Sequence, residues 1–176
     1  KGDLNFEAQS ENDFNYCVFA DIVRGNDTFR IYNVHLQSIR LQNDDYDLFE
    51  QGSAKAADKS TVRLLVDKLL IAYPKRAQQA RRVMEHVETS PYPTIVCGDF
   101  NDTPMSYTYH QFNKKLTDSY RNTSKGIGST YAGRVPAGRI DYIFHSKDLE
   151  SAGFTIQKEA YSDHRAISTR IFKQEK

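Results

Sequence analysis

The chain has 176 residues, of which 39% are hydrophobic and 27% are charged, and its formal net charge is +1. This length suffices for one domain with a buried core, and the composition is that of a globular protein rather than a disordered segment. A net charge so close to zero excludes a global field for polyanions, so any affinity for nucleic acid or lipid would need a local basic patch.

The start of the chain predicts a β-hairpin. Residues 15–23 and 28–36 are rich in Val, Ile, Phe and Tyr, and residues 24–27 (RGND) between them have the composition of a turn. Residues 40–58 are polar and are expected to form a loop. The acidic run at 43–47 lacks the Gly and the terminal Glu of a calcium-binding loop, so a solvated surface is the favoured interpretation.

The next part of the chain predicts helix. Ser60 could cap a helix whose apolar residues recur every three or four positions as far as Leu70. Pro74 is expected to kink or interrupt this helix, and the same period resumes from 77 to 87. Lys and Arg outnumber Asp and Glu here, so the region could follow phosphates or anionic lipid headgroups, although a solvated face is the commoner explanation.

Short apolar runs later in the chain predict strands. Residues 94–97 (TIVC) follow two prolines and suit a buried strand. Further strands are expected near 139–145, 153–158 and 166–172. Strands, then a helix pair, then more strands indicate a mixed α/β architecture, with residues 1–176 in a single domain that has no repeats.

The cysteines and the hydropathy bear on the environment of the chain. Cys17 and Cys97 lie in apolar runs, which favours buried, reduced thiols. A single disulfide between them stays an alternative, and the pair says little about the compartment. No stretch of sequence approaches the roughly 20 consecutive apolar residues of a membrane-spanning helix.

Four segments end a predicted strand with a polar residue that is able to take part in catalysis. They are residues 33–36 (NVHL), 98–101 (GDFN), 139–142 (RIDY) and 162–164 (SDH). Each is ordinary alone, because a His after a strand is usually structural and Asp-x-Asn is a common turn. Together they supply three carboxylates, two imidazoles and one amide, which are the groups that metal-assisted phosphoester hydrolysis needs. Strand ends in a sandwich can meet at one rim, so we expect one pocket to contain His35, Asp99, Asn101, Asp141, Asp163 and His164.

Several other chemistries lack their motifs. The sequence has no Gly-x-Ser-x-Gly elbow of a serine hydrolase and no Walker motif. Residues 126–131 (GIGSTY) lack the third glycine and the preceding strand of a dinucleotide fingerprint. Two cysteines and no pair of histidines at helical spacing argue against a zinc site.

Four longer segments occur in this order along the chain: residues 32–36 (YNVHL), 97–104 (CGDFNDTP), 139–144 (RIDYIF) and 161–164 (YSDH). In sequence and order they resemble the endonuclease/exonuclease/phosphatase superfamily, which includes deoxyribonuclease I, abasic-site endonucleases, neutral sphingomyelinases and inositol-phosphate phosphatases. The context around 35–38 (HLQS) is similar to a bacterial subgroup of membrane-associated members. The resemblance implies an α/β sandwich of two mixed sheets with helices outside.

The resemblance also implies roles for the first three site residues. His35 resembles the histidine that contacts the scissile phosphate and could protonate the leaving oxygen. Asp99 resembles the carboxylate that orients the attacking water. Asn101 resembles the amide that steadies the developing charge on the phosphate.

Three further roles follow from the same resemblance. Asp141 is similar to the aspartate that orients a second histidine, here His164, through a hydrogen bond. His164 then resembles a phosphate-binding imidazolium, whose pKa its acidic neighbour would raise. Asp163 resembles a ligand of the catalytic Mg²⁺, or of Mn²⁺ in its place, either directly or through water.

The resemblance fails before His35. Family members begin with a strand that carries an Asn and then a strand whose Glu is a principal metal ligand, and nothing before His35 matches these strands. The chain is therefore expected to be the C-terminal portion of the domain. Alone, it is expected to be nearly inactive and to self-associate through an exposed sheet edge or apolar face.

The implied activity is that of a metal-dependent hydrolase that cleaves a phosphodiester or phosphomonoester bond by in-line attack of an activated water. The alternative is a non-catalytic binding domain that retains the fold. The substrate stays open between nucleic acid and a phospholipid or small molecule, and so does the choice between endonuclease, exonuclease and phosphatase activity. The full-length protein could be anchored to a bacterial membrane.

Overall fold

The computed structural model describes residues 1–6, 14–39, 59–134, 138–159 and 161–173. The helices and strands in these ranges are β1 (Gly2–Asp3), β2 (Tyr16–Arg24), β3 (Asp27–His35), α2 (Lys59–Glu88), β4 (Thr94–Asp99), α3 (Tyr107–Asn113), β5 (Thr117–Asp118), α4 (Ser119–Thr123), β6 (Asp141–His145), β7 (Leu149–Ile156) and β8 (Ile167–Lys173).

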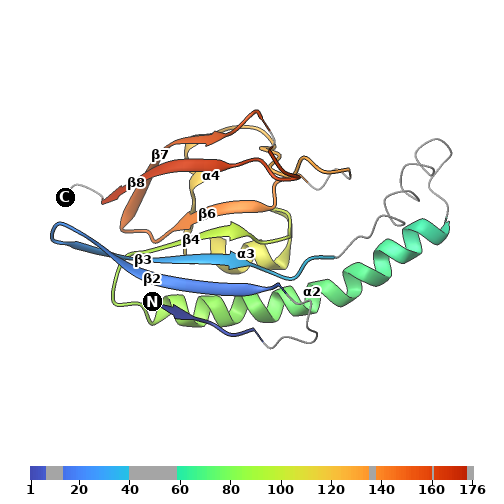
Figure 1. Ribbon diagram of the computed structural model, residues 1–176, viewed down its shortest axis with the longest axis horizontal. Helices are drawn as coiled ribbons and strands as arrows, with labels where there is room; N and C mark the ends of the chain where they lie inside the picture. Colours follow the sequence, from blue (N-terminus) through green and yellow to red (C-terminus); the bar gives the residue numbers. More distant parts are fainter. Residues whose placement is uncertain (7–13, 40–58, 135–137, 160, 174–176) are drawn as a thin grey trace.

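The strands form two sheets. A mixed six-stranded sheet has the order β1-β2-β3-β4-β6-β5, and β7 pairs with β8 in a second, antiparallel sheet that lies beside β6 (Figure 1). In the larger sheet, β3 and β4 are parallel, whereas every other neighbouring pair is antiparallel. Helices α2 and α3 lie behind this sheet (Figure 1). The expected α/β sandwich with helices outside is confirmed.

The hydrophobic core lies between the larger sheet and its helices. Successive side chains of a strand point to opposite faces, and in β3 the buried Tyr32 and Val34 alternate with the more exposed Ile31 and Asn33. Tyr32 and Val34 belong to one buried cluster with side chains of α2 and α3. That packing leaves Ile31 and Asn33 on the opposite face of the sheet, the face away from the helices.

The predicted hairpin is confirmed. Strands β2 and β3 pair in antiparallel register from Tyr16 opposite His35 to Arg24 opposite Asp27. Gly25 in the turn between them has a φ of 62°, which glycine adopts at little cost.

Helix α2 differs from the prediction at its start. It begins at Lys59, so Ser60 lies inside the helix rather than at its cap. Of the two outcomes expected at Pro74, a kink or an interruption, the interruption is excluded because the helix continues through the proline. The proline deprives the Leu70 carbonyl of its helical partner, and Leu70 and Ile71 are 64% and 62% exposed, which leaves water able to reach this turn. In Figure 1 the first part of α2 rises away from the sheet, whereas the later part runs along it.

The later strands agree with the sequence except at their ends. Strands β4, β6 and β8 occupy the predicted segments, whereas β7 begins at Leu149 rather than near residue 153. The short elements β1, β5, α3 and α4 were not predicted. The segment 40–58, expected to be a polar loop, lies outside the described residues. Cys17 and Cys97 are both free, as expected for reduced thiols.

No helix within the described ranges is long and apolar enough to cross a membrane.

Candidate active site

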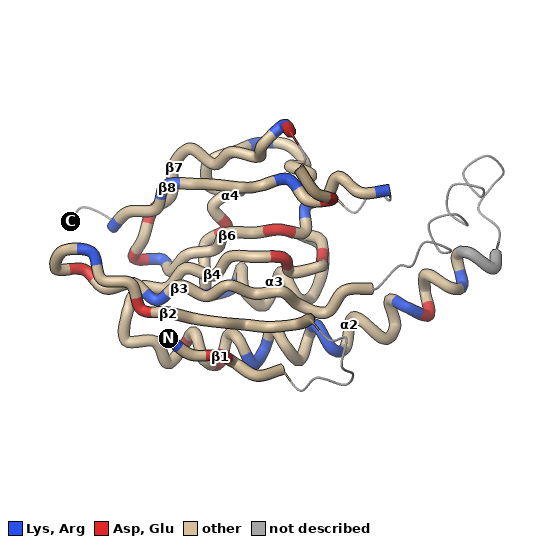
Figure 2. The backbone as a smooth tube through the Cα atoms, in the orientation of Figure 1, with Lys and Arg blue, Asp and Glu red and all other residues tan. Residues whose placement is uncertain are grey.

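Three neighbouring strands bring polar side chains to one edge of the larger sheet. Because β3 and β4 are parallel, His35 and Asp99 stand opposite each other at the ends of both strands. Because β6 runs antiparallel to β4, its first residue, Asp141, stands opposite Asp99. Figure 2 shows the acidic positions of β4 and β6 together at this edge. The strand register alone therefore aligns His35, Asp99 and Asp141 in one row.

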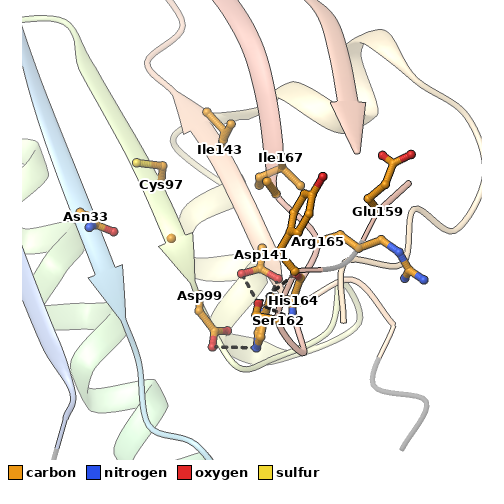
Figure 3. Close-up of a pocket in the computed structure, with 13 residues that line it drawn as sticks. Asn33, Cys97, Asp99, Asp141, Ile143, Glu159, Ser162, His164, Arg165 and Ile167 are labelled. Carbon is orange, nitrogen blue, oxygen red and sulfur yellow. Dashed lines mark hydrogen bonds and ion pairs between the residues drawn. The ribbon is translucent and has the colours of Figure 1, made fainter. Parts of the chain in front are cut away.

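His164 reaches this row from the segment that precedes β8. Its ring Nδ1 lies 2.9 Å and 3.2 Å from the two carboxylate oxygens of Asp141 (Figure 3). A carboxylate accepts and does not donate when ionised, so Nδ1 carries the proton of this hydrogen bond. The other ring nitrogen, Nε2, lies 3.9 Å from Asp99 Oδ2. The orienting contact that the sequence predicted between Asp141 and His164 is present.

Asp99 lies between the two imidazoles. Its Oδ2 is 3.6 Å from Nε2 of His35 and 3.9 Å from Nε2 of His164. The ring of His35 is turned toward Asp99 because its Nδ1 bonds to the main-chain carbonyl of Phe14 at 2.8 Å. One carboxylate thus faces an imidazole nitrogen on either side, an arrangement suited to proton transfer and to anion binding.

Asn101 holds Asp99 through both its main chain and its side chain. Its N–H donates to Asp99 Oδ1 at 2.7 Å, and its amide nitrogen donates to Asp99 Oδ2 and to the Leu36 carbonyl, both at 3.0 Å. Its φ is 53°, which is uncommon for a residue other than glycine. Both hydrogens of the amide are used inside the protein, so donating one to a phosphate would require breaking one of these bonds.

Asp163 does not join the row of site residues. Its side chain is exposed, while its main-chain carbonyl accepts a hydrogen bond from the Ala132 N–H at 2.7 Å. His164 faces Asp141, whereas Asp163 is not among the residues that line the cavity beside the row. The metal-ligand role of Asp163 stays a prediction.

Burial and charge shift the pKa values of two site residues. Burial, and then the nearby charge of Asp141, raises the pKa of the Asp99 carboxyl to about 6. The hydrogen bond to Asp141, strengthened by the charges of Asp141, Asp99 and Asp163, raises the pKa of His164 to about 8 despite partial burial. At pH 7 the pair therefore contains mostly a carboxylate and an imidazolium.

A cavity of about 570 Å³ opens beside the row (Figure 3). Asp99, Asp141 and His164 form one side of it. It extends over the face of the larger sheet that points away from the helices, where it is lined by Asn33, Cys97 and Ile143. On the other side it is closed by the segment around β8, through Tyr161, Arg165 and Ile167. The cavity combines an ionised end with an apolar wall, which suits a ligand that carries a phosphate on a less polar body.

Two supporting residues were not predicted. Thr130 is fully buried, and its hydroxyl accepts the N–H groups of Ile140 and Asp141, each at 3.1 Å. Tyr131 bridges to His164 and packs edge-on against its ring, with the centroids 5.2 Å apart. No local pattern reveals either role, because the partners of Thr130 and Tyr131 lie far along the chain.

The donor set suits a divalent cation in part. Asp99, Asp141 and His164 each offer a ligand atom, and these atoms lie within 4.8 Å of one another. Carboxylate oxygens are ligands that suit both Mg²⁺ and Mn²⁺. Mg²⁺ takes about six ligands, so water or groups outside this set would have to complete its coordination.

Comparison with known families decides the affiliation of the chain. The model of the Endonuclease/Exonuclease/phosphatase family matches residues 4–164, which include all the residues of the row. The chain belongs to this family. A search among curated proteins found no match.

Solved structures of the endonuclease/exonuclease/phosphatase family share the fold. The mannosyl-6-phosphatase of Bacteroides thetaiotaomicron is 18% identical with a TM-score of 0.62, over 90% of this chain and 57% of that chain. A family member from Bacteroides vulgatus is 16% identical with a TM-score of 0.66, over 91% and 56%. The human Nocturnin catalytic domain, solved with a bound sulfate anion, is 16% identical with a TM-score of 0.53, over 89% and 53%. The chain therefore spans little more than half the length of these structures.

Proposed function

We propose that residues 1–176 form the C-terminal portion of one endonuclease/exonuclease/phosphatase domain, and that the intact domain is a metal-dependent phosphoesterase. One observation carries this proposal. Asp99 lies 3.6 Å and 3.9 Å from the imidazoles of His35 and His164, and Asp141 bonds to the far side of His164. Family membership supports hydrolysis of a phosphoester as the reaction.

His164 binds the phosphate in this mechanism. Its Nδ1–H is fixed by Asp141, so Nε2–H points into the space next to Asp99. With its pKa raised to about 8, the ring is mostly an imidazolium at pH 7 and attracts an anionic oxygen. As the attacking oxygen adds to phosphorus, this charge stabilises the growing negative charge on the phosphate oxygens.

Asp99 orients the attacking water and accepts its proton. With a pKa near 6, it is mostly ionised at pH 7 and is still basic enough to take up a proton in the transition state. The water oxygen bonds to phosphorus as the bond to the leaving oxygen breaks. In its imidazolium form His35 gives the Nε2 proton to that leaving oxygen and becomes neutral, while its Nδ1–H keeps the ring in place through the Phe14 carbonyl.

Asn101 acts mainly through Asp99 in this proposal. The amide and the N–H of Asn101 fix both oxygens of the carboxylate, so the lone pairs of Asp99 point in a defined direction. Direct contact of the Asn101 amide with a phosphate oxygen, as the resemblance implies, would follow exchange of its bond to the Leu36 carbonyl.

Mg²⁺, or Mn²⁺ in its place, is the cofactor that the proposal includes. Asp99 and Asp141 would contribute carboxylate oxygens to it, and Asp163 would do so through water. When bound, the cation supplies Lewis-acid stabilisation of the phosphate charge. These donors cover only part of the roughly six ligands that Mg²⁺ takes, so we expect the 176-residue chain alone to be nearly inactive.

The substrate is a phosphoester, and the chemistry of the cavity is common to a nucleotide, a phospholipid headgroup and a sugar phosphate. A mannosyl-6-phosphatase and a Nocturnin domain with a bound sulfate anion share this fold, which supports an anionic phosphoester as the class of substrate. An apolar wall beside the ionised row is compatible with a lipid or aromatic leaving group, and association of the full-length protein with a membrane remains part of the proposal.

The test uses the full-length protein with Mg²⁺ or Mn²⁺ and two probes, the diester bis(4-nitrophenyl) phosphate and the monoester 4-nitrophenyl phosphate. Removing a general base typically costs 10²–10⁴-fold, and removing a group that stabilises transition-state charge costs about 10²–10³-fold. Asp99→Asn and His164→Gln should therefore each lower kcat by about 100-fold or more. His110→Gln is the matched control, because His110 is an exposed histidine on α3.

Turnover that persists in Asp99→Asn and His164→Gln would contradict the mechanism. A wild-type protein that binds inorganic phosphate by calorimetry, yet turns over neither probe nor a panel of DNA, sphingomyelin and inositol phosphates, would instead be a binding domain with this fold. Activity within the panel would separate nucleic acid from lipid and small-molecule substrates.

A further inference from the structure

Two side chains of α2 reach the loops that carry the proposed catalytic residues. Arg76 and Gln79 stand three positions apart, so they share one face of the helix. Arg76 contacts the turn that follows β4, and Gln79 contacts the segment that follows β3. Neither residue touches Asp99 or the imidazoles through any hydrogen bond in the described part of the chain.

Arg76 is buried and is committed to the turn at 101–102. Its side chain is about as buried as a core residue, with 2% exposed, and its Nη1 donates to the main-chain carbonyl of Asn101. The same Nη1 lies 3.4 Å from Oδ1 of the buried Asp102. The guanidinium also lies over the ring of Tyr73, 4.8 Å from its centroid.

Gln79 and Asn101 close a ring of contacts between the helix and both loops. Gln79 Oε1 accepts the N–H of Gln37 at 2.8 Å, and the Asn101 amide donates to the carbonyl of Leu36 at 3.0 Å. Arg76 of α2 contacts Asn101, and Asn101 contacts Leu36. The residue after Leu36, Gln37, contacts Gln79, which lies on α2 again. The loops that follow His35 and Asp99 are thereby tied to each other and to one helix.

Stability alone is a poor explanation for the buried pair of Arg76 and Asp102. Burying a guanidinium and a carboxylate costs desolvation free energy that their attraction offsets only when the remaining polar atoms are bonded as well. Among the described residues, Nε and Nη2 of Arg76 and Oδ2 of Asp102 have no hydrogen-bond partner. Replacing such a pair by apolar residues of similar volume is often neutral or stabilising, which favours a use other than stability.

The conformation of Asn101 indicates that use. A residue other than glycine at a φ of 53° persists when its surroundings hold it there. The Asn101 N–H is held by Asp99 Oδ1, and its carbonyl is held by Arg76. Releasing the carbonyl would let the turn relax, and the two bonds that Asn101 makes to the Asp99 carboxylate would move with it.

We propose that Arg76 is a positioning residue, which holds the turn at Asn101 and Asp102 so that Asp99 stays aligned between His35 and His164. This inference rests on the proposed function for its catalytic consequence, but not for its structural one. Gln79 has the corresponding role for the segment after β3.

The kinetic test compares Arg76→Met, Arg76→Lys and the control Arg82→Met in the full-length protein, with bis(4-nitrophenyl) phosphate and Mg²⁺. Arg82 is an exposed arginine on the same helix. A misplacement of about 1 Å can cost about 100-fold in rate, so Arg76→Met should lower kcat by that order while KM stays within about threefold. Arg76→Lys keeps one donor and the charge and should recover part of the loss, whereas Arg82→Met should resemble the wild type.

A double mutant separates positioning from general stability. If Arg76 acts through Asn101, adding Arg76→Met to Asn101→Ala should lower kcat by no more than about threefold, because residues that act as a unit are not additive. A loss as large as in the wild-type background would overturn the proposal. If Arg76→Met does not fold, Arg76→Lys decides the outcome through the same cycle.

Amide hydrogen exchange gives a readout that needs no activity. In Arg76→Met, exchange at Asn101 and Thr103, whose N–H groups bond to Asp99 Oδ1 and Asp102 Oδ1, should rise by at least about tenfold, whereas exchange in the β2–β3 hairpin should not change. Unchanged exchange at Asn101 and Thr103 would overturn the proposal. If the wild-type protein proves to have no phosphoesterase activity but Arg76→Met still exchanges faster, the structural role of Arg76 would be supported. Only the proposed function would then be contradicted.

Discussion

At the scale of single residues, Asp141 raises the pKa of both His164 and Asp99, by attracting the charge of the imidazolium and by repelling the charge of the carboxylate. Its hydrogen bond stabilises the imidazolium of His164, and its negative charge, added to burial, disfavours the carboxylate of Asp99. The two groups then titrate on either side of neutral pH. The Asp99–His164 pair is therefore in its active protonation state between about pH 6 and pH 8.

Asp141→Asn should lower the pKa of His164 from about 8 toward 6.5, because the charged acceptor is lost. The alkaline limb of the pH–rate profile should then move to lower pH. A raised histidine pKa adds stability that is complete below about pH 6.5 and is lost as the pH rises through 8, so the variant should lose more stability at pH 6 than at pH 9.

The measurement for Asp141→Asn is the titration of the His164 ring protons by NMR, together with urea unfolding at both pH values. Asp148→Asn, at an exposed acid in the turn before β7, is the control. An unchanged His164 titration would show that Asp141 does not set the charge of the imidazole.

Asp99→Asn should lower kcat by about 100-fold or more, and its stability relative to the wild type should be higher at pH 7.5 than at pH 4 without divalent cations. The folded-state pKa of Asp99 is raised, so its ionised form lowers stability by an amount that is fully present above about pH 6 and absent below about pH 4. Because the substitution loses one hydrogen bond from Asn101 at both pH values, the test is the difference between them. Measured by thermal unfolding, the change in stability should be more favourable at pH 7.5 than at pH 4 by about 1 kcal/mol. The same change in stability at both pH values would contradict this picture.

At the scale of elements, the site depends on how closely β3 and β4 approach each other. Gly98 precedes Asp99, has a φ of 134° and faces Val34 across the parallel pair. A Cβ at this position would overlap the Val34 carbonyl oxygen. Only glycine therefore lets the two strands deliver His35 and Asp99 side by side.

Gly98→Ala should destabilise the fold by about 3 kcal/mol or more, because it combines an unfavourable φ with a backbone clash. Gly25→Ala is the matched control, since Gly25 also has a positive φ but a Cβ there meets nothing within 4 Å. That substitution should cost only about 1–2 kcal/mol. Urea unfolding of both variants measures the difference, and equal losses would show that the contact with Val34 is not the cause.

At the scale of the whole molecule, the larger sheet is covered on one face and open on much of the other. On the open face, which points away from the helices, Val18 and Ile22 of β2 are 41% and 46% exposed. Both residues line a cavity on this face together with Ile31. An open apolar face of this kind favours association. The solved relatives are nearly twice as long as the part of them that this chain matches.

The 176-residue chain should self-associate at micromolar concentration through the open face of the larger sheet, as sedimentation velocity can measure. Ile22→Lys should shift the chain toward the monomer by placing a charge on the face. Val66→Lys is the control, because Val66 has a similar exposure, 44%, but lies on α2. A wild-type chain that stays monomeric, or equal effects of both variants, would contradict the assignment of the surface.

The sequence by itself determined the local features of this protein. The β2–β3 hairpin, the strand at β4 and the placement of His35, Asp99 and Asp141 at strand ends all follow from turn composition and apolar patterns over a few residues. Such patterns are readable because the interactions behind them connect near neighbours in the chain. The family resemblance rests on the same short segments.

Only the tertiary structure decided the features that depend on distant contacts. It left the Asp163 side chain exposed while its neighbour His164 met Asp141, 23 residues away. It also tied the turn after β4 to α2 through a buried Arg76, which sequence alone groups with solvated cations, and the segment after β3 to α2 through Gln79. It also carried α2 through Pro74. Burial, strand register and the orientation of single side chains come from packing between elements, and no local pattern encodes them.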